Sequence, residues 1–330
     1  MEKLNIALLT PGLLPIPPVG WGAIEKYLYN YKLHFEKMGH TVEFCLSNHY
    51  SFDHFDIVYT CVHNQGTHLK ARGVPYIFAP DDTTPYLEGK GSWIYDSNKK
   101  AMEDALLVIH HSDLMMDFYN EFGYKTFHVP HGVDSEKYIP FHHNKVETHK
   151  LLCSAKNLPV DRKGFRFAME AAINLNLPIT VAGPNKNQWF FDIYPQYKDY
   201  SKLTLLDNLD EPELIQILNE HTIFMNVSEL EAGLPNLAMI EALSCGVPVV
   251  GTYPNRKKIK GMREVELTNE STIEGVKDVM NNYEDYRIKA RETARSFDWF
   301  DVTYRLNEIF QYILPEFRKL KNKDGQFIHD

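Results

Sequence analysis

The sequence predicts an α/β protein built from parallel sheets in two domains. Short β-branched or aromatic segments alternate with helical patterns along the chain, which is typical of βαβ units. A polar segment, residues 141–149, divides this alternation into two series. The length of 330 residues also exceeds the roughly 250–300 at which single hydrophobic cores usually stop growing. We therefore expect two domains that meet near residue 145.

The expected strands are short apolar segments between helical patterns. The first series comprises residues 5–10, 41–46, 56–61, 75–79, 106–111 and 125–129. The second series comprises residues 150–154, 178–182, 203–206, 222–227 and 247–251. Strands that alternate with helices predict parallel pairing in both sheets.

The first expected helix follows the first strand. Apolar residues from Ile24 to Met38 repeat every three or four positions, and Gly39 follows as a stop. Residues 11–22, before this helix, are rich in proline and glycine, which disfavours helical structure. Gly20 and Gly22 would let the backbone approach a ligand closely. This segment is therefore a candidate ligand loop.

The C-terminal segment also has a helical period. One apolar stripe runs from Trp299 to Leu320, and Pro315 within it should kink or break the helix.

Composition and charge narrow the class of protein. The net charge of -9 opposes broad electrostatic binding to nucleic acid. No apolar run approaches the roughly 20 residues that span a bilayer, and the N-terminus lacks a secretory pattern, so we expect a soluble protein. Four cysteines without metal-binding spacing fit a reducing cytoplasm. The fifteen histidines include no HExxH motif; His110 and His111 end a strand, one expected to support the fold and the other to line a cleft.

Three glutamates stand in residues 228–250, a segment that otherwise has the composition of protein interior. The flanking strands make residues 228–236 a loop at the carboxyl end of a strand, where open α/β sheets bind ligands. Pro235 suits the first turn of a helix and Gly246 suits its stop. This places Glu231 on the loop and Glu241 within the helix.

Carboxylates accept hydrogen bonds, so Glu231 and Glu241 could hold the hydroxyls of one elongated ligand. Unpaired N–H groups at the start of the helix would attract phosphate or sugar oxygens. The alternative to ligand binding is that Glu229 and Glu231 face solvent and that Glu241 accepts hydrogen bonds from backbone N–H groups. Both interpretations stay open on the residues alone.

The segment 228–250 resembles the two-glutamate signature of GT-B retaining glycosyltransferases, especially glycosyltransferase family 4. Other similar segments follow in the expected order: residues 20–27, 37–44, 109–119, 129–138, 161–172, 179–183 and 209–228. The resemblance implies two Rossmann-like domains that face each other across a cleft. Residues 1–145, joined by a C-terminal helix at 313–330, would bind the acceptor, and residues 146–312 would bind a nucleotide sugar.

The resemblance also implies roles for individual residues. Glu241 would bind the ribose and Glu231 the hydroxyls of the donor sugar, while Lys156 and Lys163 would stabilise the leaving diphosphate. The remaining expected donor contacts are Gly20, Gly22, Gly183, Leu206, Gly233, Leu234, Asn236 and Leu237. No cofactor and no metal would be required.

Three features depart from the family pattern. Asp81 stands next to Asp82 in a segment of the first domain where many relatives carry a histidine. Nine residues separate Glu231 from Glu241, more than is usual, so Glu229 stays an alternative to Glu231. Lys156 stands in place of an arginine, and its ammonium cannot donate the two parallel hydrogen bonds that a guanidinium offers to a diphosphate.

Asp81 and Asp82 follow a strand of the acceptor domain. Either could orient the acceptor or take its proton, and a helix cap or Asx turn is the competing interpretation.

The predicted function is that of a retaining hexosyltransferase. It would move a sugar from a UDP- or GDP-sugar, with UDP favoured, to a hydroxyl of a glycan, a lipid-linked acceptor or a small molecule. Peripheral membrane contact through Trp21, Tyr27 and Tyr29 stays open. The alternatives are an epimerase or hydrolase of the same fold, a non-catalytic sugar-nucleotide-binding module, and a transferase acting on modified DNA bases. A dinucleotide-binding dehydrogenase is disfavoured because Glu25 stands where the third glycine belongs.

Overall fold

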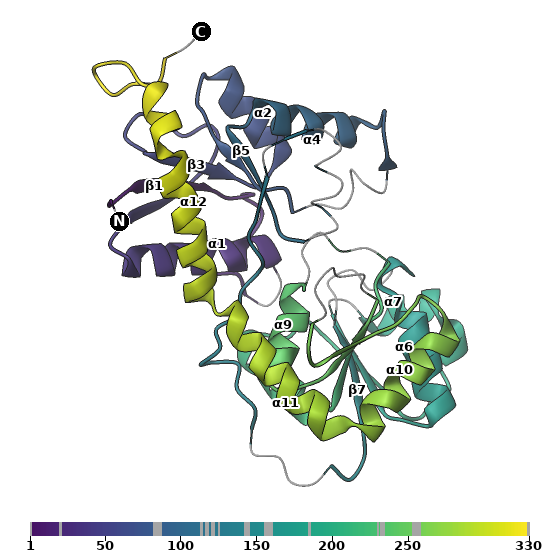
Figure 1. Ribbon diagram of the computed structural model, residues 1–330. Helices are drawn as coiled ribbons and strands as arrows, with labels where there is room; N and C mark the ends of the chain where they lie inside the picture. Colours follow the sequence, from purple (N-terminus) through teal and green to yellow (C-terminus); the bar gives the residue numbers. More distant parts are fainter. Residues whose placement is uncertain are drawn as a thin grey trace.

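The computed structural model describes most of the chain. The described residues are 2–19, 22–81, 88–112, 115, 119, 123–124, 126–141, 146–154, 161–183, 186–229, 231, 235–252 and 259–328. They form two lobes, each with one sheet between layers of helices (Figure 1). We call the lobe that holds the first sheet the N-terminal lobe and the other the C-terminal lobe.

The N-terminal sheet has six parallel strands in the order β2-β1-β3-β4-β5-β6. The strands are β1 (Asn5–Leu9), β2 (Thr41–Cys45), β3 (Ile57–Thr60), β4 (Ile77–Phe78), β5 (Leu107–His110) and β6 (Thr126–His128). All six coincide with expected strands. Every residue of β3 and β5 is buried, because helices cover both faces of the sheet.

Three helices of this lobe are α1 (Ala23–Lys37), α2 (His63–Ala71) and α4 (Trp93–Asp104). The apolar stripe predicted from Ile24 onwards forms the buried side of α1. The hydroxyl of Ser92 caps α4 by accepting a hydrogen bond from the Tyr95 amide. The α1 N-cap is Gly22, whose φ of 131° favours glycine.

The C-terminal sheet has six parallel strands in the order β12-β11-β10-β7-β8-β9. They are β7 (Leu151–Ser154), β8 (Ile179–Ala182), β9 (Leu203–Leu206), β10 (Ile223–Asn226), β11 (Val249–Gly251) and β12 (Met262–Glu264). Five of these match expected strands. The sequence analysis missed β12, which is a short edge strand whose two last residues are exposed charged side chains.

Helices cover both faces of this sheet. They are η1 (Asp161–Lys163), α6 (Phe165–Leu175), α7 (Lys186–Ile193), η2 (Pro195–Tyr197), α8 (Glu211–Glu220), α9 (Leu237–Ser244), α10 (Asn269–Asn281), α11 (Tyr283–Ala294) and η3 (Arg295–Phe297). Alternate residues of β10 enter different cores: Ile223 and Met225 pack with α6 and α10, while Phe224 packs with α8 and α9.

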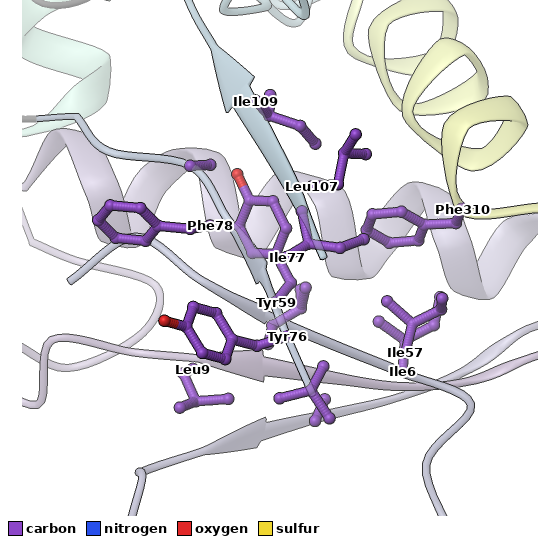
Figure 2. Packing of buried hydrophobic residues seen from close by; sticks show 14 of the residues in the cluster. Ile6, Leu9, Ile57, Tyr59, Tyr76, Ile77, Phe78, Leu107, Ile109 and Phe310 are labelled. Atoms are coloured by element: carbon purple, nitrogen blue, oxygen red, sulfur yellow. The ribbon is translucent and has the colours of Figure 1, made fainter. Parts of the chain in front are cut away.

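The last helix, α12 (Trp299–Lys319), leaves the C-terminal lobe and lies along α1 of the N-terminal lobe (Figure 1). Trp299 meets Tyr31 edge-on, with ring centroids 5.7 Å apart. Farther along, Phe310 stacks on Phe35. Phe310 also lies near Tyr59 of β3, among the buried side chains of the sheet (Figure 2). The chain thus returns to the N-terminal lobe from Trp299 onwards. The predicted domain boundaries at residues 145 and 313 stay a prediction.

The helix α12 continues through Pro315 to Lys319, so the expected break does not occur, while the expected kink stays a prediction. Burial of Leu314 and Phe317 on either side of the proline stabilises the last turn. Among the helices in the described residues, none is long and apolar enough to cross a membrane. All four cysteines are free thiols and buried.

Candidate functional site

The structure describes most, but not all, of the predicted site residues. Gly20, Asp82, Lys156, Gly233 and Leu234 lie outside the described residues. The others lie near the carboxyl ends of strands, or in or beside the helices that follow them.

One cluster lies beyond the carboxyl end of β10. Lys163 Nζ donates a hydrogen bond to Glu231 Oε1 at 2.5 Å, and the hydroxyl of Ser228 donates to the same oxygen at 2.6 Å. Both members of the ion pair are largely buried, with 20% of the Lys163 side chain and 13% of the Glu231 side chain exposed. We call these three residues the Lys163 cluster. They place a carboxylate and an ammonium together at a ligand-binding edge of the sheet.

Gly164 explains how Lys163 reaches this strand end. Its φ of 66° lies in the left-handed region, and a Cβ there would stand 1.8 Å from the Val227 carbonyl oxygen. Only glycine therefore lets η1 approach β10 so closely. The backbone hydrogen bond from the Glu229 amide to the Arg162 carbonyl, 2.8 Å long, fixes the same approach.

The two candidate glutamates differ in their surroundings. The Glu229 side chain is exposed, while Glu231 lies inside the Lys163 cluster. The geometry therefore favours Glu231 as the first functional glutamate, although its role is still a prediction.

The helix α9 begins with a side-chain cap. Asn236 Oδ1 accepts from the Met239 amide at 3.0 Å, and its amide group donates to Asn226 Oδ1 at 3.0 Å. Asn236 is thus the N-cap, and Pro235 precedes the helix instead of standing in its first turn, because the asparagine side chain satisfies the free N–H group there. The Nδ2 of Asn226 is buried and has no hydrogen-bond partner among the described residues.

Glu241 lies in a second cluster, which joins the lobes. Its carboxylate accepts a hydrogen bond from Lys26 Nζ of α1, and that ammonium also contacts the Tyr138 hydroxyl at 2.9 Å. Glu211 stands 3.8 Å from Lys26 and also pairs with Lys137. These five residues, the Lys26 cluster, border a cavity of about 240 Å³ between the lobes.

The charged groups of the Lys26 cluster shift the pKa values of two of its members, Tyr138 and Glu211. Burial and the carboxylates of Glu241 and Glu211 raise the pKa of the Tyr138 phenol, so this group stays protonated. Burial alone would raise the pKa of Glu211, but the Lys137 and Lys26 ammonium groups outweigh it and lower that pKa. The carboxylate of Glu241 pairs with a cation of the other lobe, and no backbone N–H of the described residues donates to it.

The remaining donor-side predictions lie at strand or helix ends. The Gly183 amide donates to the Leu206 carbonyl at 3.3 Å, just beyond β8 and β9. Leu237, the first residue of α9, packs against the core of the N-terminal lobe. The Lys163 and Lys26 clusters are separate: among the described side chains no hydrogen bond or ion pair joins them.

A third cluster lies at the carboxyl edge of the N-terminal sheet. Asp81 Oδ1 stands 3.6 Å from His131 Nε2, and the imidazoles of His131 and His111 stack with centroids 4.7 Å apart. The Tyr27 ring packs 5.6 Å from each imidazole. We call these four residues the Asp81 cluster. Burial raises the pKa of Asp81, but His131 and His111 outweigh it, so that pKa is lowered.

His131 is not among the residues that the sequence predicts for the site. Its position directly after β6 and Pro130, at the same sheet edge as Asp81, was the signal available. Both His110 and His111 are buried: His110 stacks on His128, and His111 stacks on His131 near Asp81, so the expected lining of a cleft by one of them stays a prediction.

The arrangement of two parallel α/β sheets with a returning C-terminal helix is the GT-B fold. Residues 162–307, most of the C-terminal lobe, match a family model described as glycosyl transferase-like. These findings confirm the expected resemblance to GT-B glycosyltransferases. Among curated protein sequences, none is significantly similar to this chain.

Solved structures of similar fold cover nearly the whole chain. Sucrose-phosphate synthase from Thermosynechococcus elongatus has a TM-score of 0.79 at 12% identity, over 95% of this chain and 100% of that one. HepE from Anabaena in complex with UDP-glucose has a TM-score of 0.74 at 12% identity, over 94% and 100%. AviGT4, a glycosyltransferase involved in avilamycin A biosynthesis, has a TM-score of 0.69 at 16% identity, over 95% and 99%.

Proposed function

We propose that this protein is a retaining glycosyltransferase that moves a sugar from a nucleoside-diphosphate sugar to an acceptor hydroxyl. The observation that carries the proposal is the Lys163 cluster, which holds a carboxylate and an ammonium 2.5 Å apart at the carboxyl end of β10. A polyhydroxylated donor needs both groups, because hydroxyls donate to the carboxylate and the diphosphate pairs with the ammonium.

Lys163 supplies the main electrostatic contribution to the reaction. As the bond between the sugar and the diphosphate breaks, the leaving group gains negative charge, which a fixed ammonium in a largely dry site stabilises. Lys156 is proposed to assist. Two lysines meet this need without a divalent metal, so we expect activity in the presence of a chelator.

Retention follows if the acceptor attacks on the face that the diphosphate leaves. Glu231 would hold the sugar hydroxyls during this step, and Glu241 the ribose. Since Glu241 already contacts Lys26, the ribose must share this carboxylate with Lys26 or displace it.

A UDP-sugar is the favoured donor and a GDP-sugar the alternative. HepE, whose fold is similar, was solved with UDP-glucose, and starch synthase IV from Arabidopsis thaliana was solved with ADP and acarbose. We propose that the N-terminal lobe takes the acceptor, a glycan, a lipid-linked sugar or a small molecule, and that the protein works in the cytoplasm.

The proposal is tested with purified protein and a panel of UDP- and GDP-sugars. Binding is measured by calorimetry and transfer by mass spectrometry over an acceptor panel, with and without EDTA. Transfer with retained anomeric configuration would support the proposal. Rapid turnover of the donor without any acceptor would indicate an epimerase or hydrolase, and tight binding without turnover would indicate a binding module. Transfer to modified DNA bases would identify the remaining alternative.

A further inference from the structure

The end of β2 brings together three side chains that can bind a metal ion. One ligand atom each from Glu43, Cys45 and His49 lies within 4.8 Å of the other two. Carboxylate oxygen, thiolate sulfur and imidazole nitrogen are the protein ligands that zinc takes. These residues belong to the N-terminal lobe, and the proposed transfer reaction gives none of them a role. We call them the Cys45 cluster.

The pleat of β2 and the turn after it build the Cys45 cluster. Glu43 and Cys45 are two positions apart on the strand, so their side chains point to the same face of the sheet. The turn that follows bends the chain back, with the His49 amide donating to the Leu46 carbonyl at 2.9 Å. The guanidinium of Arg72, just after α2, donates to two carbonyl groups of the same loop. The backbone is therefore held in place without using the three ligand side chains.

The Cys45 cluster is partly open to solvent. The Glu43 side chain is 49% exposed and His49 is half-buried, while Cys45 keeps 4% of its surface exposed. In the described part of the chain, no hydrogen bond engages the Cys45 sulfur or the ring nitrogens of His49. An ion can therefore enter from the side of the carboxylate and meet donor atoms that the fold leaves available.

A surface ion pair is the competing interpretation. His54 Nε2 lies 3.9 Å from Glu43 Oε1, and both side chains are about half exposed, a setting in which an ion pair contributes little. This pair explains the position of Glu43 but of neither other ligand. The His49 ring also packs near Phe55, with centroids 6.0 Å apart, and Cys45 belongs to the core. Packing places the ring and the sulfur, but it does not require their ligand atoms to converge on a carboxylate.

The ligand atoms are close to the spacing that a bound ion needs. Zinc–ligand bonds of about 2.0–2.3 Å put the ligand atoms of a tetrahedral ion roughly 3.3–3.6 Å apart. The widest separation in the cluster must therefore shrink by about 1 Å. Rotation of the Glu43 and His49 side chains can supply this movement because both reach solvent, whereas Cys45 stays fixed in the core.

We propose that Glu43, Cys45 and His49 bind one Zn²⁺ ion. The thiolate selects zinc over magnesium and calcium, which prefer oxygen ligands. Burial and the Glu43 carboxylate raise the pKa of the Cys45 thiol to about 12, so this thiol gives its proton to solvent only when the ion binds. Three protein ligands leave the fourth position of the tetrahedron for water.

The ion would stabilise one edge of the N-terminal sheet. The strand β2 is the edge strand, and zinc would link its end to the loop that follows. The Thr10 amide donates to the Cys45 carbonyl at 3.0 Å, so the linked strand end also borders the start of the candidate ligand loop. Because the ion holds a loop and not the leaving diphosphate, the zinc site is independent of the proposed sugar transfer.

Zinc binding to the purified full chain tests the site. The protein is stripped with EDTA, dialysed, kept reduced and titrated with Zn²⁺ by calorimetry. Wild type should bind one ion per chain. His49→Gln should weaken zinc binding by at least about 100-fold, because loss of even an outer partner of a zinc ligand costs about 10 to 100-fold. The control His68→Gln changes an exposed histidine of the same lobe, which contacts the Ser47 hydroxyl, and should bind zinc as wild type does.

Cobalt gives a second readout that reports the sulfur directly. A Co²⁺ ion bound to a thiolate has a sulfur-to-cobalt charge-transfer band in its absorption spectrum. Wild type loaded with Co²⁺ should show this band, and Zn²⁺ should abolish it by displacing the cobalt. The band should be absent in Cys45→Ser. It should persist in the control Cys153→Ser, which removes another buried free thiol.

The outcomes separate the zinc site from the proposed function. Absence of zinc binding in wild type, or equal zinc affinity in wild type and His49→Gln, overturns the zinc site. Tighter binding of Mg²⁺ or Ca²⁺ than of Zn²⁺ overturns it as well. If Cys45→Ser does not fold, the cobalt spectra of His49→Gln and Glu43→Gln decide, and a wild-type band in both contradicts the assignment. A chain that binds zinc in this way but transfers no sugar from any donor keeps the zinc site and loses the transferase function.

Discussion

Lys26 of α1 donates a hydrogen bond to the carboxylate of Glu241 in α9, so two residues 215 positions apart join the two lobes. The contact joins the glutamate proposed to bind the donor ribose to the N-terminal lobe, which is proposed to bind the acceptor. Glu241 keeps only 5% of its side chain exposed and has no other cation within ion-pair distance in the described part of the chain.

Lys26→Met should therefore destabilise the protein more than loss of an ordinary surface pair. The variant leaves a buried carboxylate without its cation, and we expect a loss of about 1–3 kcal/mol in the free energy of unfolding, since the lysine is itself partly exposed. Urea denaturation measures this change. The control Lys99→Met removes the exposed pair with Glu103 and should cost less than about 1 kcal/mol. Equal losses of unfolding free energy in both variants would show that the contact between the lobes stabilises the protein no more than an exposed ion pair does.

Lys163→Met should slow sugar transfer and also cost some stability, because it leaves the largely buried Glu231 carboxylate without its cation. Removing a charge that stabilises the leaving diphosphate should lower kcat by about 10² to 10³-fold, the range seen when one electrostatic donor is lost. Steady-state kinetics on wild type and variant check the ratio. The control Lys198→Met removes an exposed lysine of the same lobe and should leave kcat unchanged. A Lys163→Met enzyme with wild-type kcat would remove this residue from the site.

Gly164→Ala should disrupt the Lys163 cluster through the backbone. The new Cβ would stand 1.8 Å from the Val227 carbonyl oxygen, so η1 must move away from β10. The control Gly325→Ala also has a positive φ but meets nothing within 4 Å, so it reports the conformational cost alone, about 1–2 kcal/mol. We expect a greater loss of unfolding free energy in Gly164→Ala than in the control. Similar losses would mean that the close approach is dispensable.

The stability of the protein should fall between pH 7 and pH 5, and His111 should account for part of the fall. Burial and the neighbouring His131 lower its folded pKa to about 4, below the usual 6.5, so the unfolded chain binds more protons and stability is lost as the pH falls through this window. One such histidine contributes a change of about 2 kcal/mol between pH 7 and pH 5. Urea denaturation at both pH values measures it. His111→Gln should reduce the loss of stability between pH 7 and pH 5 by about 2 kcal/mol. An unaltered pH dependence in this variant would show that His111 is not responsible for the loss.

The sequence predicts the strands well because their apolar runs carry a local signal. All eleven expected strands form, and among the described residues the short, largely exposed β12 is the one strand that the sequence does not predict. Lys163 and Glu231 could likewise be expected at one sheet edge, since each follows a strand end. Lys26 could not be paired with Glu241 in this way, because that contact depends on how two lobes dock. His49 could not be assigned to a metal site either, because its approach to the end of β2 depends on the turn between them.

The helix α12 has a consequence for synthesis of the chain. Trp299, Phe310 and Phe317 belong to the core of the N-terminal lobe, yet they follow the strands of both sheets in the chain. A nascent chain that stops before α12 must leave an apolar face of α1 uncovered, while the C-terminal sheet already has all six of its strands. The lobe whose sheet is made first therefore has its core completed only after the sheet of the other lobe has been made.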